Sequence, residues 1–349
     1  MTSLERTMAV INGKLPDRVP TDLHNFMMAS RMAGIPLSEC LKSGELMAES
    51  QLVAWRYFGH DMLLVENGTS VMAEAMGCEL SWNDHSSPQI VKPALKSIGD
   101  IDSLRLPDPE RDGLLPEVLY AVSILRDEIG DGVFIMGRAD QAPMALAAAV
   151  RGYERFMMDI VEYPEAVESL LDKCLEAITR YALALQRAGA HGTSIGEIGC
   201  ETISPATYQR FALPRLKKFF AAMKAANFPA ALHQCGNAAA VLTDMTETGA
   251  DILELDPKTD IYTAKAVSRG KVTVLGMVDP ANVLHRGTPE LVEEKSREAL
   301  EVMAPGGGFI LGPGCALVAD TPEDNVTALV ECARTHGVYR QDSTLSAVC

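Results

Sequence analysis

His233 and Cys235 place an imidazole and a thiol two residues apart at the end of a short apolar run. In an extended strand, side chains two residues apart point to the same side, so both groups can face one ion. Cys315 ends the segment Gly312-Pro313-Gly314-Cys315, which follows another apolar run. Two thiolates and one imidazole favour Zn²⁺ over a hard cation, and three protein ligands leave a fourth position for exchange, as in catalytic zinc sites. The alternative is a buried thiol pair beside a core histidine, because three scattered ligands form no closed zinc motif.

Other polar side chains also follow apolar runs. Asp256 could hold the metal until a substrate atom displaces it, or it could cap the helix predicted near residues 259–266. Glu197 and Asp140 are candidate general acids or bases, with a purely structural role as the alternative. Asn237 and Asp279 stand at equivalent places, and we predict that they contact the cofactor.

Two further patterns resemble ligand-binding motifs. The segments Gly306-Gly307-Gly308 and Gly312-Pro313-Gly314 resemble a phosphate-binding loop, but no Gly-Lys-Ser/Thr follows. We therefore interpret them as backbone turns on either side of a strand. Asp22-Leu23-His24 resembles the start of a cobamide-binding motif, which continues to Gly where this chain has Met27. We therefore predict that the chain carries no corrinoid of its own.

These residues need a scaffold that brings distant strand ends together. From about residue 130, short β-rich runs alternate with amphipathic helical patterns, which is typical of βαβ units. The runs cover residues 133–137, 192–196, 230–235, 251–255, 272–276 and 308–312, with two earlier runs near 19–24 and 61–66. Eight strands can close an α/β fold of the (β/α)8 TIM-barrel type, whose catalytic groups stand at the carboxyl ends of the strands.

The segment 67–116 is irregular and rich in proline, and we interpret it as an N-terminal insertion that covers one mouth of the barrel. No linker or repeat divides the chain, so we expect a single domain over residues 1–349.

Composition limits the function classes. The 31 Lys and Arg against 47 Asp and Glu give a net charge of −16, which argues against nucleic acid and anionic membranes and suits a protein partner. No apolar run approaches the roughly 18 residues of a membrane helix, and no signal peptide is evident, so we expect a cytoplasmic protein. The eight cysteines do not indicate a disulfide framework. Cys200 is a weaker candidate ligand, and most of the others should be core residues.

At the residues above, the sequence resembles the uroporphyrinogen decarboxylase superfamily, and within it the zinc-dependent corrinoid methyltransferases, which include methylcobamide:coenzyme M and O-demethylase methyltransferases. The resemblance covers nearly the whole chain, with landmarks at residues 14–20, 74–79, 152–159, 203–208, 232–237 and 321–326. This branch pairs His-x-Cys with a later Gly-Cys, so the resemblance implies His233, Cys235 and Cys315 as zinc ligands. Members of this branch have a Glu at the position that aligns with Asp256. This difference leaves the identity of the fourth ligand open.

The resemblance implies a barrel that accepts a corrinoid protein at its open mouth and moves a methyl group between the corrinoid and a small thiol or methoxylated substrate, as in one-carbon metabolism. Its zinc would activate a thiol as thiolate or polarise an ether oxygen. One alternative is decarboxylation of a tetrapyrrole, with Arg31 and Arg138 holding its carboxylates. A second is a non-catalytic barrel that binds zinc or the corrinoid partner. The sequence does not name the methyl donor or acceptor.

Overall fold

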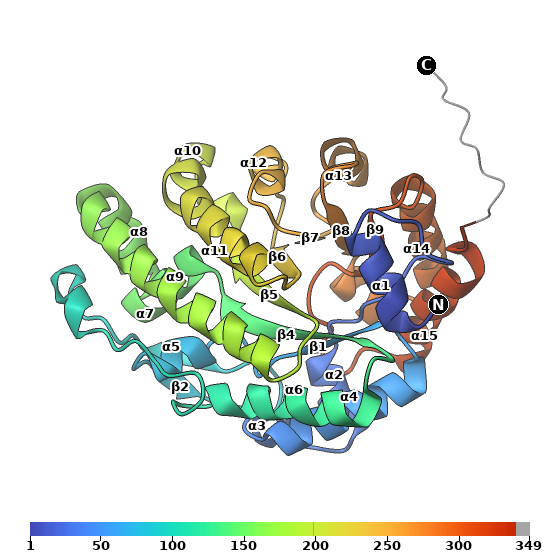
Figure 1. Cartoon of the computed structure of the whole chain (residues 1–349), viewed down its shortest axis with the longest axis horizontal. Helices are drawn as coiled ribbons and strands as arrows, with labels where there is room; N and C mark the ends of the chain where they lie inside the picture. Colours follow the sequence, from blue (N-terminus) through green and yellow to red (C-terminus); the bar gives the residue numbers. More distant parts are fainter. Residues whose placement is uncertain (198, 340–349) are drawn as a thin grey trace.

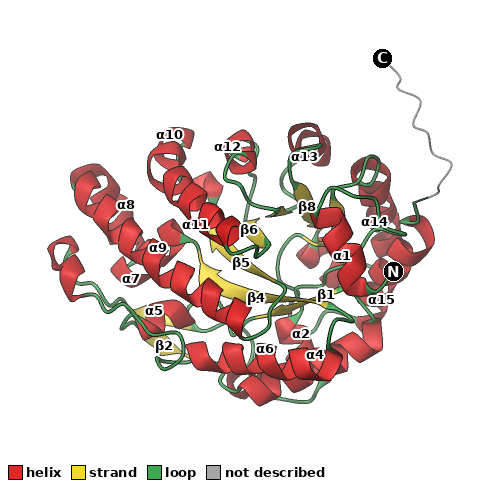
Figure 2. Cartoon of the chain, in the orientation of Figure 1, coloured by secondary structure: helices red, strands yellow, loops and turns green. Residues whose placement is uncertain are grey.

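Seven parallel strands form one curled sheet, and helices surround it on the outside (Figures 1 and 2). The structure is a computed structural model that describes residues 1–197 and 199–339. The strands of this sheet, in their spatial order, are β1 Met62–Val65, β4 Phe134–Gln141, β5 Gly192–Glu197, β6 Ala230–Gln234, β7 Ile252–Leu255, β8 Thr273–Val278 and β9 Phe309–Pro313. Each begins within one residue of its predicted run. The predicted parallel α/β fold is therefore confirmed.

The predicted run at 19–24 is an extended segment between the two edge strands. Thr21 forms an isolated parallel bridge to Leu311 of β9. The amide of Asp22 donates to the carbonyl of Leu311, and the amide of Asp61, just before β1, donates to the carbonyl of Thr21. The segment thus contacts both edges of the sheet and takes the eighth position of the barrel, although it is too short and irregular to count as a strand.

Helices follow the strands as the alternation of patterns predicted, and Thr288 caps α14 by accepting a hydrogen bond from the amide of Leu291. The α-helices are α1 Ser3–Ile11, α2 Phe26–Met32, α3 Leu37–Cys40, α4 Gly44–Phe58, α5 Val71–Ala75, α6 Leu115–Ile129, α7 Pro143–Arg151, α8 Tyr153–Glu162, α9 Pro164–Arg187, α10 Pro205–Thr207, α11 Leu213–Ala225, α12 Leu242–Thr246, α13 Ile261–Ser268, α14 Pro289–Met303 and α15 Glu323–His336. Shorter 3-10 helices are η1 Ile98–Ser103 and η2 Cys200–Thr202, and η3 Tyr208–Ala212 and η4 Pro280–His285 are π-helices. None of the described helices is long and apolar enough to cross a membrane.

An apolar layer fills the barrel interior toward the amino ends of the strands. Because alternate residues of a strand face the same side, each strand except β5 contributes one or two members. They are Met62, Leu64, Phe134, Met136, Ala231, Ile252, Leu275 and Ile310, all buried. Helix α1 packs Val10 against this layer and so closes the amino end of the barrel.

Residues 67–114, between β1 and α6, contain α5, η1 and a small antiparallel sheet of β2 Glu79–Ser81 and β3 Gln89–Lys92. Several of them, among them Pro88, Ile90 and Pro93, line the cavity at the carboxyl end of the barrel. The segment therefore borders this mouth. That it is an insertion stays a prediction.

Candidate functional site

A layer of charged side chains lies directly above the apolar layer of the barrel. Two residues beyond Leu64, Met136, Ala231 and Ile252 stand Glu66, Arg138, His233 and Glu254, which are all 4% exposed. The period of two along each strand turns these side chains to the same interior side as the apolar layer. With His24, which ends the bridging segment at residues 19–24 and is also buried, they form what we call the charged layer.

The three predicted metal ligands meet at this level. His233 is the fourth residue of β6, Cys235 follows the strand directly, and Cys315 follows β9. The Nε2 atom of His233 lies 2.9 Å from the Sγ atom of Cys235, and the two Sγ atoms lie 4.0 Å apart. One ligand atom from each residue lies within 4.8 Å of the others. The structure thus brings together a possible His/Cys/Cys metal site from residues 80 positions apart.

The two thiols of the group differ in acidity. The hydrogen bond from the Cys315 thiol lowers the pKa of Cys235, although burial opposes the shift. Donation of that same hydrogen bond, together with burial, raises the pKa of Cys315 to about 12. Cys235 is therefore the group that gives up its proton first. A thiolate is the form of cysteine that binds a soft metal.

The glycines around Cys315 serve backbone geometry, as the sequence predicted. Gly306, Gly307 and Gly308 all have positive φ values, between 72° and 84°, in the turn before β9. A Cβ atom at Gly314 would stand 2.6 Å from the carbonyl oxygen of Leu255. The close approach lets the chain bring Cys315 against the ends of β7 and β8.

Behind His233, the charged layer forms a continuous chain of opposite charges. The Nδ1 atom of His233 lies 3.1 Å from Oε2 of Glu254, whose Oε1 lies 2.8 Å from Nδ1 of His24. The other ring nitrogen of His24 lies 3.4 Å from Glu66, and Glu66 lies 3.1 Å from Nε of Arg138.

These contacts favour the charged forms of His24 and Glu254 in spite of burial. Burial lowers the pKa of His24, but the carboxylates of Glu254 and Glu66 outweigh it and raise that pKa well above its usual value. Burial raises the pKa of Glu254, but the two imidazoles outweigh it and hold that pKa well below its usual value. The same competition raises the pKa of His233 to about 9.

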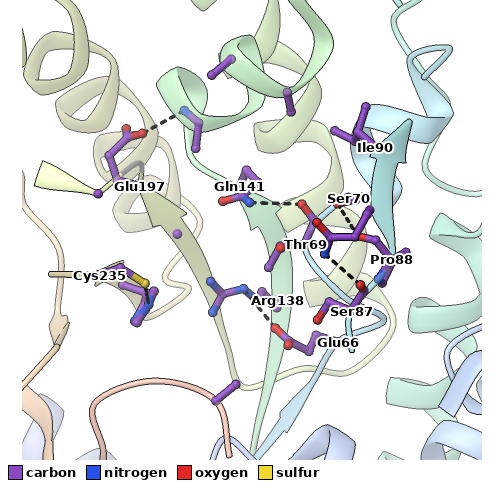
Figure 3. A pocket seen from close by; sticks show the side chains of 18 of the residues that line it. Glu66, Thr69, Ser70, Ser87, Pro88, Ile90, Arg138, Gln141, Glu197 and Cys235 are labelled. Atoms are coloured by element: carbon purple, nitrogen blue, oxygen red, sulfur yellow. Dashed lines mark hydrogen bonds and ion pairs between the residues drawn. The ribbon is translucent and has the colours of Figure 1, made fainter. Parts of the chain in front are cut away.

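A cavity of about 640 Å³ opens above this layer. Figure 3 shows Arg138 between Cys235 and Glu66, all directed into the cavity. Gly196 makes room for Arg138, because a Cβ atom there would overlap the guanidinium group. Ala145, Ala148 and Ala149 of α7, with Pro88, Ile90 and Pro93, form an apolar part of the lining, next to polar residues such as Ser87 and Gln89. Arg138 is the one Arg or Lys among the lining residues that the structure describes.

The two predicted acid–base residues have different positions. Glu197 lines the cavity, and its Oε1 accepts a hydrogen bond from the amide of Ala145 in the first turn of α7. Asp140 is buried outside the cavity lining, has a strained φ of 70°, and accepts a hydrogen bond from the amide of Met72 in α5. Burial raises the pKa of Asp140 to about 7. The geometry brings Glu197 to the cavity and gives Asp140 a contact that holds α5.

The remaining predicted residues lie in loops, outside the cavity lining. Asp256 accepts hydrogen bonds from the amides of Gly236 and Lys258, one on each oxygen, and it does not cap α13, because Asp260 takes that position. Asp279 caps η4 by accepting from the amides of Ala281 and Asn282.

Asn237 is exposed in the loop that follows Cys235, and its side-chain oxygen accepts from the amide of Ala239. Cys174 and Cys332 are buried core residues, as predicted. The side chain of Cys200 and the whole of Cys349 lie outside the described residues. The described structure therefore assigns the predicted ligand role to no further cysteine.

Sequence reasoning missed Glu254, Glu66 and His24 as parts of the site. The signal was available in the strand period, because each carboxylate stands two residues after an interior apolar residue, namely Ile252 and Leu64. His24 was set aside with the cobamide motif, and Arg138 was considered only for a decarboxylase.

The fold and the site together define a class of protein. It is a curled parallel α/β barrel with a His/Cys/Cys group at the base of an open cavity. The uroporphyrinogen decarboxylase (URO-D) family matches residues 2–336, and the chain belongs to this family. A solved structure described as a methyltransferase from Methanosarcina mazei superimposes with a TM-score of 0.89 at 28% identity, covering 96% of this chain and 98% of that one.

Among curated relatives, the methylcobamide:CoM methyltransferase MtbA of Methanosarcina acetivorans is 30% identical over 301 residues, 85% of this chain and 86% of the relative. A uroporphyrinogen decarboxylase of Syntrophotalea carbinolica is 27% identical over 300 residues, 84% of this chain and 85% of that one. The resemblance to corrinoid methyltransferases drawn from the His-x-Cys and Gly-Cys motifs is confirmed.

Proposed function

We propose that this chain is a zinc-dependent methyltransferase that moves a methyl group between a corrinoid on a partner protein and a small thiol or methoxylated substrate. The observation that carries the proposal is the convergence of His233, Cys235 and Cys315 at the base of the cavity. Two sulfur atoms and one nitrogen suit zinc, and three ligands leave a position for a substrate atom. When bound there, zinc supplies Lewis acidity that favours a thiolate or polarises an ether oxygen.

The residues of the chain have separate tasks in this proposal. The apolar wall formed by α7 and residues 88–93 excludes water from the reacting methyl group. Glu197, which lines the cavity, is our candidate to exchange a proton with the departing or arriving oxygen or sulfur atom. Asp140 positions α5.

We keep Asp256 as the candidate for the fourth, displaceable ligand, a role that requires it to release the amide of Gly236. The exposed Asn237 is our candidate contact with the corrinoid partner. Asp279 supports the neighbouring loop through η4. A decarboxylase of a polyanionic tetrapyrrole would require several cations, but Arg138 is already paired with Glu66, and Arg31 lies in a different pocket and pairs with Glu323.

The first measurement is the metal content of the purified protein. We expect about one zinc per chain in the wild type and loss or strong weakening of binding in Cys235→Ala and Cys315→Ala, because each removes a third of the ligand set. Cys332→Ala is the matched control, since that buried thiol lies in α15 and belongs to no described ligand group. A metal-free wild type with full activity contradicts the zinc requirement.

The second measurement is the visible spectrum of a cobamide mixed with the enzyme. With the correct methyl donor, Co(I) should convert to methyl-Co(III), and with the correct thiol acceptor the reverse change should appear. The change should disappear in His233→Ala and persist in His285→Ala, whose imidazole lies outside the cavity lining. If no thiol, methoxyarene or methylamine changes the spectrum while uroporphyrinogen is decarboxylated without zinc, the proposal is wrong.

A further inference from the structure

We propose that Glu254 is a positioning residue for the metal ligand His233, and that His24, Glu66 and Arg138 hold Glu254 in place through the charged layer. The inference rests on the proposed function, because it assigns His233 to zinc. It adds Glu254, which lies outside the cavity lining, and the residues that hold it to the set that determines zinc affinity.

The first step concerns the two faces of the His233 ring. Its Nε2 atom points to the thiols, 2.9 Å from the sulfur of Cys235, so it is the nitrogen available to the metal. A neutral imidazole that donates a lone pair from Nε2 carries its proton on Nδ1. The Nδ1 atom of His233 lies 3.1 Å from Oε2 of Glu254. A carboxylate there fixes the tautomer and the ring orientation and increases the basicity of the ligand nitrogen.

The second step concerns the carboxylate itself. Glu254 belongs to β7, which pairs with β6 so that residues 233 and 254 are direct register partners. It is absent from the cavity lining and lies at the edge of the His233 ring away from the thiols. Glu254 is thus placed to act through His233 and not on a substrate.

The third step explains why Glu254 keeps one orientation. Its second oxygen lies 2.8 Å from Nδ1 of His24, and the other nitrogen of His24 lies 3.4 Å from Glu66. Arg138 closes the row, 3.1 Å from Glu66. Each member is buried, so a broken contact would leave a charge with little access to water. The row therefore resists rotation of any one member.

Such a row of charges is a poor means of stabilising a fold, because desolvation cancels much of the attraction and a well-packed apolar layer serves at least as well. The apolar layer directly below shows that the same strands can supply that solution. The carboxylates, the imidazole and the guanidinium instead lie behind one metal ligand, His233. This placement fits a role in setting the orientation and basicity of that ligand.

The test is zinc affinity measured by competition with a chromophoric chelator. Glu254→Gln, which keeps the size of the side chain and removes its charge, should weaken zinc binding by about 10- to 100-fold. His24→Gln should weaken it in the same direction and by less, because Glu254 remains. Asp251→Asn is the matched control, since this carboxylate precedes the amino end of β7, where it accepts from the amide of Ala230. It should leave zinc affinity unchanged.

X-ray absorption and thermal unfolding separate positioning from misfolding. The Glu254→Gln protein should unfold cooperatively, and zinc-loaded samples should show a longer or more disordered zinc–nitrogen shell with the zinc–sulfur shell unchanged. A zinc affinity within twofold of wild type in both Glu254→Gln and His24→Gln overturns this inference and leaves the proposed function standing. A wild type that binds no zinc overturns both.

Discussion

Asp22 is a buried carboxylate in the barrel interior, with one oxygen that has no hydrogen-bond partner in the described structure. Burial and the negative charge of Glu254 raise the pKa of Asp22 to about 7. In the unfolded chain an aspartate releases its proton near pH 4. The folded protein therefore keeps a proton between pH 4 and 7 that the unfolded chain has lost. The stability contributed by this proton is complete below pH 4 and is lost as the pH rises through about 7.

We accordingly predict that Asp22→Asn raises the free energy of unfolding relative to wild type more at pH 8 than at pH 5, by a few kcal/mol at most. The amide cannot ionise, so it avoids the cost that the carboxylate meets at high pH. Urea denaturation of both proteins at the two pH values measures the difference. A difference between the proteins that does not change with pH would show that Asp22 is ionised throughout, or neutral throughout, in the fold.

At the scale of elements, Asp61 connects α1, the bridging segment and β1. Its buried carboxylate accepts hydrogen bonds from Arg6 and Arg18, and from both the amide and the hydroxyl of Thr21. Burial raises the pKa of Asp61, but the guanidinium of Arg18 and the other donors outweigh it and lower that pKa. The carboxylate thereby fixes the helix that closes the amino end of the barrel.

Asp61→Asn should lower the free energy of unfolding by about 3–5 kcal/mol. Arg6 loses a buried counter-charge, and the amide and hydroxyl of Thr21 lose a charged hydrogen-bond acceptor. Asp17→Asn is the control. It also removes a partner of Arg6, but the side chain of Asp17 is 44% exposed, so water reaches this carboxylate. That change should cost about 1 kcal/mol or less. Equal losses in the two variants would contradict the role assigned to Asp61.

The strands and long helices of this chain were predictable from its sequence, because their patterns are local. Helix α9, for example, ends at Arg187, two residues before Gly189, whose positive φ of 109° does not continue a helix. The segment at 19–24 was placed correctly along the chain, but its reduction to a single bridge depends on how two distant edges meet. The hydrophobic pattern of a short segment carries no information about the separation of these two edges.

The metal ligands were predictable because their chemistry is specific, whereas the carboxylates were harder to assign. We chose acidic residues that follow strands, such as Asp256 and Asp279, and the structure shows both accepting backbone amides in turns. Short acidic side chains in loops commonly serve their own backbone in this way. The carboxylates that face the interior are Glu66, directly after β1, and Glu254, the last residue but one of β7. Only the alternation of side chains along a strand distinguishes them from the carboxylates in loops.

At the scale of the whole molecule, the amino end of the barrel is built for stability and the carboxyl end for chemistry. The apolar layer, α1 and the Asp61 contacts lie on one side, and the charged layer, the thiols and the cavity lie on the other. This division is general for parallel barrels. Substitutions on the two sides should accordingly separate, with unfolding free energy affected mainly on the first and metal binding or activity on the second.

Thr21 leaves the ribosome long before Leu311, its partner in the parallel bridge. Until β9 is made, the growing chain has a sheet with two unpaired edges, and unpaired edges invite pairing with other chains. A truncated chain of residues 1–307, which lacks β9, should therefore self-associate during expression, whereas a chain of residues 1–339 should remain dispersed. Sedimentation of the two proteins after synthesis in a cell-free system distinguishes them. Equal dispersal would mean that the barrel tolerates an open seam, and that nascent chains need no chaperone to guard it.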